Sequence, residues 1–408
     1  LKTTIQQASR APFYAKRLAE AGVSADNLRS LEDIRRIPFT SKDDLRSQYP
    51  YGLATVPHSE FVRMHCSSGT TGTPVAVCYT QPDINSWADL MARCLHLAGV
   101  RQDDVFQNMS GYGLFTGGLG IHFGAERLGC MTIPAGAGNS KRQLKLVKDF
   151  GTTVAHILPS YALHLGTTLI EEGEDPKALS LRIACVGAEP YTEETRRRIE
   201  ALFDMKVYNS YGLSEMNGPG VAFECSAQSG MHINEDHFIA EIIDPDTGEV
   251  LPEGSKGELV FTSIDKEAFP LLRYRTRDIC ILKREKCSCG RTLVKMCKPM
   301  GRSDDMLIIR GVNVFPSQIE TVLLNHGYPA NYQIIVGRVK STDTLDVHVE
   351  MTPEMFTDNV GEIERRQKQL VDGLRAMLGL AAKVTLVAPK SIVRSEGKAV
   401  RVIDNRKI

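Results

Sequence analysis

Strand-like and helical segments alternate through the middle of the chain, and this alternation restricts the fold more than any other feature of the sequence. Apolar strands are predicted at 104–109, 132–134, 154–158, 181–187 and from 206 onward. Such alternation is typical of βαβ units, so we predict an α/β domain with a mostly parallel sheet. Ligands bind these sheets at the carboxyl ends of strands, where we expect loops at Gly187 and Tyr211.

A hydroxyl-rich loop at 67–74, with the sequence SSGTTGTP, joins two short predicted strands at 61–66 and 75–79. Its glycines let backbone N–H groups turn inward and its hydroxyls add donors, so the loop suits an anion. No lysine follows the second glycine, which excludes a Walker A loop. Taken alone, the segment fits a polar surface hairpin better than a binding loop.

A second glycine-rich segment, at 110–118, carries Tyr112 and Phe115. Glycines beside aromatic residues permit close backbone approach and leave an apolar wall, which suits a small aromatic ligand. The same pattern also fits a loop whose aromatic side chains fill the core.

The predicted secondary structure changes character at two points along the chain. Residues 1–50 have helical spacing, and from Gly230 short strands and turns predict a β subdomain at about 230–300. The segment 301–305 then precedes an α+β region large enough for its own core. We therefore predict an N-terminal domain at 1–301 and a C-terminal domain at 305–408, joined by residues 302–304, which become a hinge only through the family resemblance given below.

Composition excludes several classes of function. The 408 residues are 42% hydrophobic and 24% charged, with a net charge of zero, so no basic nucleic-acid surface is expected. No segment is apolar enough for a membrane span or a signal peptide, so no membrane partner is expected. Ten cysteines scattered over a long chain favour free thiols in a reducing cytoplasm.

Five short motifs follow one another along the chain: SSGTTGTP at 67–74, YGLSE at 211–215, RYRTRD at 273–278, GRSDD at 301–305 and RSEGK at 394–398. In this order they resemble the adenylate-forming acyl-CoA ligases. Within that superfamily the chain is similar to the phenylacetate–CoA ligase family. The specific pointers are GYGLFTGG at 111–118, NEDHF at 234–238 and GRSDDMLIIRGVNVFP at 301–316.

This resemblance implies the adenylate-forming fold, with a large N-terminal domain of mostly parallel sheets plus a β subdomain, and a small mobile α+β C-terminal domain. It also implies an enzyme that uses ATP, Mg²⁺ and coenzyme A. An aryl acid such as phenylacetate is activated as an acyl-adenylate and transferred to coenzyme A, with release of pyrophosphate and AMP. A homodimer is a further expectation from the family alone.

The resemblance also assigns roles to residues. Lys398 would bridge the acid carboxylate and the α-phosphate, Glu215 would hold Mg²⁺, Thr70 and Thr71 would contact the phosphates, and Asp278 would accept from the ribose hydroxyls. The remaining nucleotide contacts would be Ser67, Ser68, Gly69, Gly72, Gly187, Ala188, Glu189, Pro190, Asn209, Ser210, Tyr211, Gly212 and Arg302, with Tyr211 against the adenine.

The aryl-binding segment of the family corresponds to Tyr112, Gly113, Phe115 and Gly117, and its hinge to Asp304. Indoleacetate, a hydroxylated phenylacetate and a benzoate-type acid remain open as substrates. Two other readings also remain open: an enzyme with another acid or acceptor, similar to the coenzyme F420 adenylyltransferases, and a non-catalytic nucleotide-binding regulator.

A metal site is a separate hypothesis from the residues themselves. Cys225, His232, Cys287 and Cys289 offer three thiolates and an imidazole, a donor set that suits tetrahedral Zn²⁺ in a structural role. The spacing is not the usual one, and reduced structural cysteines are the alternative. Cys297 is a spare ligand.

Overall fold

The computed structural model describes residues 1–67, 74–189, 191–303, 307–310, 312–339, 342–356, 360–392 and 401–406. The chain divides into two compact units, one formed by Leu1–Ala188 with Arg196–Pro299 and the other by Glu189–Thr195 with Met300–Ile408. Each unit has its own hydrophobic core.

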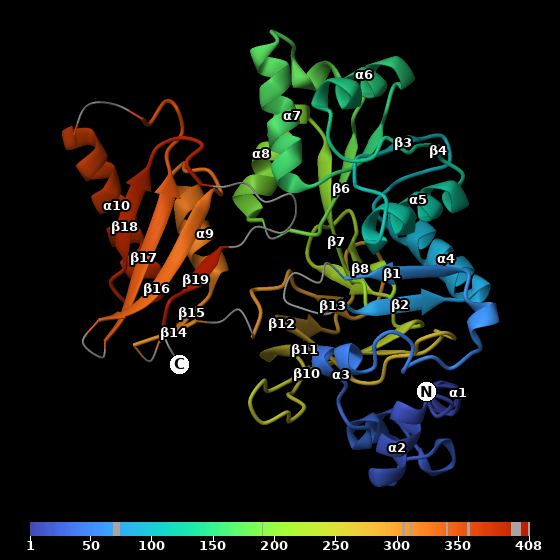
Figure 1. Ribbon diagram of the computed structural model, residues 1–408. Helices are drawn as coiled ribbons and strands as arrows, with labels where there is room; N and C mark the ends of the chain where they lie inside the picture. The colour runs from blue at the N-terminus through green and yellow to red at the C-terminus, as the bar shows by residue number, and fades with distance from the viewer. Residues whose placement is uncertain are drawn as a thin grey trace. The chain divides into compact units, whose positions relative to one another are not determined.

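The first unit begins with helical segments and continues into strands that alternate with helices (Figure 1). In chain order its main elements are α1 (Lys2–Ala8), α2 (Pro12–Glu20), α3 (Lys42–Ser47), β1 (Arg63–Cys66), β2 (Ala76–Tyr79), α4 (Gln81–Leu97), β3 (Val105–Asn108), α5 (Thr116–Leu128), β4 (Met131–Ile133), α6 (Ser140–Phe150), β5 (Val154–His156), α7 (Pro159–Glu171), β6 (Ile183–Val186), α8 (Glu193–Phe203), β7 (Lys206–Leu213), β8 (Gly218–Glu224), β9 (Met231–Ile233), β10 (Phe238–Ile243), β11 (Lys256–Ser263), β12 (Tyr274–Lys283) and β13 (Lys295–Met296).

The described strands of this unit, apart from the β1–β2 hairpin, form one 11-stranded sheet in the order β10-β11-β12-β13-β9-β8-β7-β6-β5-β3-β4. Pairing is parallel from β4 through β3, β5 and β6 to β7, which confirms the predicted βαβ arrangement. In Figure 1, α4 and α5 lie on one side of these strands and α7 and α8 on the other. Burial on both faces explains why β5 and β6 are buried throughout.

The antiparallel region begins earlier than predicted. β7 pairs with β6 only as far as Asn209 and then continues as an antiparallel partner of β8. Tyr211, expected in a loop, therefore lies within β7 and opposite Ala222. The reason is that β6 ends at Val186, so the next backbone groups of β7 find their partners on β8. The strands beyond Gly230 extend the same sheet.

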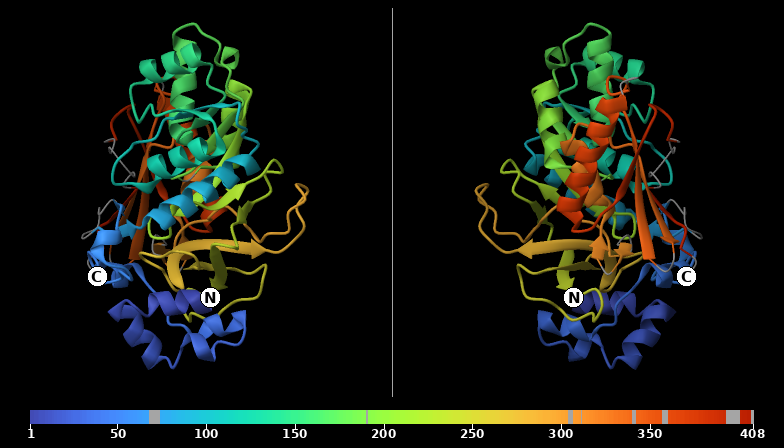
Figure 2. Two further views of the ribbon diagram at one scale, coloured as in Figure 1. Left: turned by 90° about the vertical axis from the view of Figure 1, so that its right-hand side faces the viewer. Right: turned by 90° about the vertical axis from the view of Figure 1, so that its left-hand side faces the viewer.

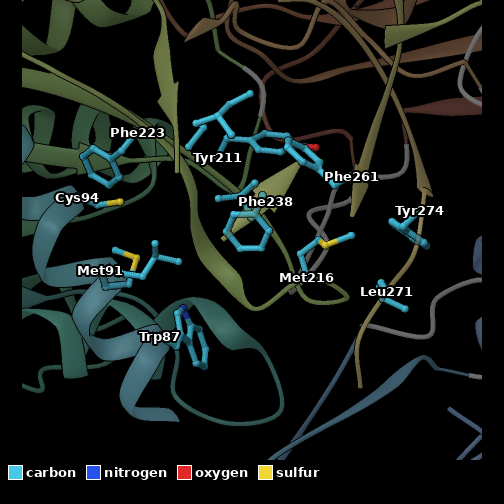
Figure 3. Packing of buried hydrophobic residues seen from close by; sticks show 14 of the residues in the cluster. Trp87, Met91, Cys94, Tyr211, Met216, Phe223, Phe238, Phe261, Leu271 and Tyr274 are labelled. Carbon is cyan, nitrogen blue, oxygen red and sulfur yellow. The ribbon is translucent and has the colours of Figure 1, made fainter. Parts of the chain in front are cut away.

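In the core of the first unit, α4 packs against both α5 and β8. The two helices α4 and α5 lie side by side in Figure 2. Trp87 and Met91 of α4 are almost fully buried, and Figure 3 shows Cys94 beside Phe223 of β8, with Met91 between Cys94 and Trp87. The buried residues of α4 recur every three or four positions, so they lie on one face of the helix.

The second unit contains two sheets and two helices in its described residues. They are β14 (Leu307–Ile309), β15 (Val312–Val314), α9 (Pro316–Asn325), β16 (Tyr332–Val339), β17 (Thr342–Glu350), α10 (Val360–Leu378), β18 (Lys383–Val387) and β19 (Val402–Asp404). The larger sheet has the order β18-β17-β16-β19. Ile334, Val347 and Leu370 form part of its core, so this α+β unit buries apolar residues of its own.

Candidate active site

Several predicted site residues lie outside the described part of the chain. They are Ser68, Gly69, Thr70, Thr71 and Gly72 of the hydroxyl-rich loop, together with Pro190, Asp304 and Lys398. Their roles remain predictions. The two ends of the loop are described: Ser67 N donates to Val75 O and Val75 N donates to Ser67 Oγ, both at 2.9 Å. These bonds extend the β1–β2 hairpin to the loop's edge.

Two residues from separate motifs meet behind the carboxyl end of the parallel strands. The hydroxyl of Tyr211 on β7 donates a 2.6 Å hydrogen bond to Oδ2 of Asp278 on β12. The backbone N–H of Asp278 in turn donates to Thr276 Oγ1 at 3.0 Å. Burial, and then the neighbouring carboxylate of Asp278, raise the pKa of Tyr211 well above its ordinary value, so the phenol stays a donor.

Close backbone packing explains the glycines at these strand ends. A Cβ on Gly187 would lie 2.7 Å from Ser210 Oγ, and one on Gly212 would lie 1.9 Å from Gly218 O. Ser210 Oγ donates to Val186 O at 3.1 Å, which ties β7 to the end of β6. Ala188 adopts a positive φ of 66°, so the chain leaves β6 in a sharp bend.

A buried ion pair holds the backbone of Asn209 in place. The guanidinium of Arg196 donates to both oxygens of Glu224 at 2.8 Å, and Asn209 N donates to Glu224 Oε2 at 2.7 Å. All three residues are buried. Two predicted nucleotide residues, Glu189 and Arg302, belong to the second unit.

Glu215 occupies the turn between β7 and β8. Its carboxylate is 7% exposed, and Oε1 lies 3.4 Å from the ammonium of Lys42 at the start of α3. α3 is placed there because Thr40 pairs with Tyr274 of β12 through backbone hydrogen bonds. Glu215 thus already faces a cation, and carboxylate oxygen is a ligand that Mg²⁺ accepts.

The predicted acid-binding segment lies next to the point where the strand order reverses. From β3 the chain runs outward to β4, whereas β5, β6 and β7 lie on the other side of β3. Such a switch point opens a crevice at the carboxyl ends of the flanking strands. Asn108 ends β3 and His156 ends β5, and their side chains meet at 2.9 Å between His156 Nδ1 and Asn108 Oδ1.

Asn108 also holds the aromatic residue of that segment. Its Nδ2 donates to the hydroxyl of Tyr112 at 2.9 Å and to Gly118 O at 2.7 Å. The same hydroxyl lies 3.1 Å from His122 Nδ1, and burial raises the pKa of Tyr112. Tyr112 is therefore fixed from two sides.

The other residues of the segment distinguish the two interpretations of the sequence. The side chain of Phe115 is 56% exposed, so this aromatic does not fill the core. A Cβ on Gly117 or Gly113 would meet no atom within 4 Å, whereas one on Gly118 would lie 2.4 Å from Gly111 O. Close packing within the protein thus requires glycine at 118, while Gly113 and Gly117 border open space.

The four predicted metal ligands come together from three parts of the first unit. The ligand atoms of Cys225, His232, Cys287 and Cys289 all lie within 4.8 Å of one another. Cys225 Sγ and Cys287 Sγ are 3.7 Å apart, and Cys289 Sγ is 3.5 Å from His232 Nε2. This donor set fits a tetrahedral Zn²⁺ ion.

A tight turn positions two of these thiols. Gly290 N donates to Cys287 O and Cys287 N donates to Arg291 O, both at 2.9 Å, and Gly290 has a φ of 91° that favours glycine. The spare ligand Cys297 lies elsewhere: its Sγ faces Cys280 Sγ at 3.5 Å.

Sequence reasoning did not find Lys42, Asn108 or Glu224, each of which contacts a predicted site residue. Asn108 could have been suspected, since it is a polar residue at the end of an apolar strand that precedes a glycine-rich loop. Lys42 and Glu224 carry no sequence pattern that indicates their partners.

Comparisons with known proteins were consistent over the whole chain. The family model for the AMP-binding enzyme matches residues 18–264, and that for the AMP-binding enzyme C-terminal domain matches residues 311–406. A phenylacetate–coenzyme A ligase of Pseudomonas putida is 48% identical, over 97% of this chain and 90% of the relative. One of Thermus thermophilus is 47% identical, over 98% and 93%.

Solved structures show the same fold. The 2-hydroxyisobutyryl-CoA ligase in its postadenylation state, in complex with 2-HIB-AMP, has a TM-score of 0.91 at 31% identity, over 99% of this chain and 88% of that chain. The same ligase in its thioesterification state, with 2-HIB-AMP and CoA, has a TM-score of 0.72 at 31% identity, over 100% and 88%. In the described part of the chain, no helix has the length and apolarity needed to cross a membrane.

Proposed function

This chain belongs to the AMP-binding enzymes and, within them, to the phenylacetate–coenzyme A ligase family, and we propose phenylacetate or a close aryl acid as its substrate. It is an AMP-forming acid–CoA ligase with the adenylate-forming fold. In the first half-reaction a carboxylate oxygen attacks the α-phosphorus of ATP and pyrophosphate leaves. In the second, the thiol of coenzyme A attacks the acyl carbon, loses its proton, and AMP leaves.

In the first half-reaction, hydrogen-bond donors of the chain compensate the negative charge of the phosphates. Thr70, Thr71 and the amides of residues 67–72 bind the phosphates, and Lys398 bridges the attacking carboxylate and the α-phosphate. Donors held in place before the reaction stabilise developing charge without reorganisation. The support for these roles is the order of the family motifs and the closed base of the loop at Ser67 and Val75.

The nucleoside is held by the ends of β6, β7 and β12. Asp278 accepts from the ribose hydroxyls while Tyr211 fixes its carboxylate, and Tyr211 also borders the adenine. The carrying observation is the 2.6 Å hydrogen bond between these two residues, which joins two motifs 67 positions apart. The other members of the nucleotide site are Gly187, Ala188, Glu189, Pro190, Asn209, Ser210, Gly212 and Arg302.

Glu215 is the proposed ligand of Mg²⁺. When bound, this ion would neutralise phosphate charge. Glu215 is buried and held in place by Lys42, whose ammonium provides the opposite charge beside the carboxylate. Burial keeps competing water away from the charged group.

The acid is proposed to bind beside Tyr112, Gly113, Phe115 and Gly117. The exposed ring of Phe115 and the fixed ring of Tyr112 offer apolar surface to a planar aryl group. One methylene changes discrimination by only about 1–3 kcal/mol in an apolar pocket, so indoleacetate and benzoate-type acids belong in the same test.

Rotation of the C-terminal domain about Asp304 is proposed to separate the half-reactions. The two attacks come from different directions, and domain motion lets one site serve both. A structural neighbour is described in both a postadenylation and a thioesterification state, which supports a two-state mechanism in the family.

Three further features complete the proposal. Cys225, His232, Cys287 and Cys289 hold a structural Zn²⁺ ion, as their donor set and mutual proximity support. All ten cysteines are free, which supports a reducing cytoplasm. A homodimer is the expected assembly, and light scattering on the purified protein measures it.

A screen of carboxylic acids for AMP release, with and without coenzyme A, tests the proposal. Aryl acids, phenylacetate first, are expected to release AMP only when coenzyme A is present. Acid-dependent pyrophosphate exchange with no AMP release when coenzyme A is added would indicate an adenylyltransferase that uses another acceptor. Nucleotide binding without turnover of any acid would indicate a regulator.

A further inference from the structure

Lys266 is a lysine buried inside the first unit. It lies in the segment between β11 and β12 and is 4% exposed. Its Nζ donates to Asn217 Oδ1 at 2.8 Å and lies 3.7 Å from the ring centroid of Tyr79. Burying an ammonium costs free energy unless nearby groups stabilise its charge, so the contacts of Lys266 indicate its role.

Two carboxylates, those of Asp83 and Asp265, favour the charged form of Lys266 through space, but both are bound by other groups. Asp83 accepts from the backbone N–H groups of Thr80, Glu267 and Ala268. Asp265 faces Ser86 and His237. Within the described residues neither carboxylate forms an ion pair with Lys266.

The remaining titratable neighbours of Lys266 are Cys78, Tyr79 and His65. Burial lowers the pKa of Lys266 to about 8. Besides the carboxylates of Asp83 and Asp265, the direct contacts that favour its charged form are the Asn217 oxygen and the face of Tyr79.

Asn217 closes the turn that carries Glu215. This turn, residues 214–217, joins β7 to β8, and Met216 N donates to Leu213 O at 3.0 Å within it. Tyr79 Oη donates to the backbone oxygen of Asn217 at 3.2 Å, while Lys266 binds its side chain. One residue of the turn is thus held from both its backbone and its side chain.

These contacts form a short path to the proposed metal ligand. Lys266 fixes Asn217, which is two residues from Glu215, and Lys42 holds the Glu215 carboxylate at 3.4 Å. An apolar residue at 266 could fill the space without the cost of a buried charge, but it could not bind the Asn217 oxygen.

We propose that Lys266 is a positioning residue for adenylation, which fixes the 214–217 turn through Asn217 so that Glu215 presents its carboxylate to the metal-bound phosphates. This inference rests on the proposed role of Glu215 as the Mg²⁺ ligand. It predicts a defect in Mg²⁺ dependence and none in acid binding.

The test measures acid-dependent ATP–pyrophosphate exchange against Mg²⁺ concentration. Lys266→Met is expected to raise the Mg²⁺ concentration for half-maximal exchange about tenfold, the factor expected for loss of one hydrogen bond to a charged group, with an unchanged KM for the acid. Asn217→Ala removes the other partner of that bond and should give the same shift. The double variant should be no worse than either single variant.

Lys145→Met, at an exposed lysine of α6, is the matched control and should leave the Mg²⁺ dependence unchanged. A loss of exchange in Lys266→Met that is equal at every Mg²⁺ concentration would overturn the proposal and leave a purely structural lysine. Asn217→Ala decides the question if Lys266→Met does not fold, because an unchanged Mg²⁺ dependence there contradicts the proposal.

Glu215→Gln separates this inference from the function on which it rests. If Glu215→Gln leaves the Mg²⁺ dependence unchanged, the proposed metal ligand is wrong. If Glu215→Gln shifts it and neither Lys266→Met nor Asn217→Ala does, the positioning role is wrong and the metal ligand stands.

Discussion

The hydroxyl of Tyr211 on β7 donates a 2.6 Å hydrogen bond to Oδ2 of Asp278 on β12. A hydrogen bond to a carboxylate is stronger than a neutral one and orients the acceptor. Tyr211 is buried, so its phenol is held in place beside the carboxylate. Tyr211 therefore helps to orient Asp278.

Tyr211→Phe is expected to raise the KM for ATP about tenfold, since a hydrogen bond to a charged group contributes roughly 1.5–3 kcal/mol. The KM for the acid should change little. ATP–pyrophosphate exchange at varied ATP measures the effect. Tyr208→Phe, at another buried tyrosine of β7, is the control and should behave as wild type. An unchanged KM for ATP in Tyr211→Phe would contradict the assignment of Asp278 to the ribose.

The cysteine–histidine cluster is expected to retain zinc through dialysis at about one equivalent per chain. Cys287→Ser and Cys289→Ser should each lose most of this zinc and lower Tm, because metal binding stabilises the fold that assembles the ligands. Elemental analysis and thermal unfolding measure both effects. Cys297→Ser, whose thiol faces Cys280, should keep the metal. Far less than one equivalent in the wild type would leave these residues as reduced structural cysteines.

Low pH is expected to destabilise the first unit through protonation of His156. Burial lowers the pKa of this imidazole from 6.5 to about 4. Below pH 6.5 the imidazole is protonated in the unfolded chain but stays neutral in the folded chain. The free energy of unfolding is therefore highest above pH 6.5 and decreases as the pH falls toward 4. The loss reaches about 3 kcal/mol.

Urea unfolding between pH 7.5 and pH 4.5 measures this dependence. His156→Gln keeps a donor for Asn108 without titrating, so its unfolding midpoint should vary less with pH. His164→Gln, at an exposed histidine of α7, should follow the wild type. Parallel curves for all three proteins would show that His156 does not carry the effect.

Loss of Glu224 is expected to destabilise the strand that carries Asn209. Glu224→Gln leaves the Arg196 guanidinium buried without its full counter-charge, which costs about 3–5 kcal/mol. For a unit of this size the Tm should fall by roughly 10 °C. Asp149→Asn breaks the exposed Lys145–Asp149 pair and should cost at most about 1 kcal/mol. Similar losses in both variants would show that burial does not decide the effect.

A rigid residue at the proposed hinge is expected to separate the two half-reactions. Asp304→Pro should leave acid-dependent pyrophosphate exchange largely intact and lower thioester formation at least about tenfold, because only the second step needs domain rotation. Asp304→Ala keeps backbone freedom and serves as the control. Equal losses in both half-reactions would place the hinge elsewhere.

Features that depend on local pattern could be read from the sequence. Strands alternating with helices predicted the parallel pairing of β3 to β7. The resemblance of ordered motifs identified the family. The four metal-binding candidates could be chosen by chemistry alone, since Cys and His are few and reactive. Their proximity could not, because it depends on how distant strands pair.

The tertiary structure decided which residues support those motifs. Four supporting residues act through partners that lie up to about two hundred positions away: Lys42, Asn108, Lys266 and Glu224. From sequence alone, an isolated lysine or glutamate is expected to lie in solvent. Tyr211 was expected in a loop, yet the end of β6 makes it part of β7. Sequence alone determined the chemistry available to this protein. The tertiary structure determined which buried charges and hydrogen bonds hold that chemistry in place, because burial and long-range pairing exist only in the folded chain.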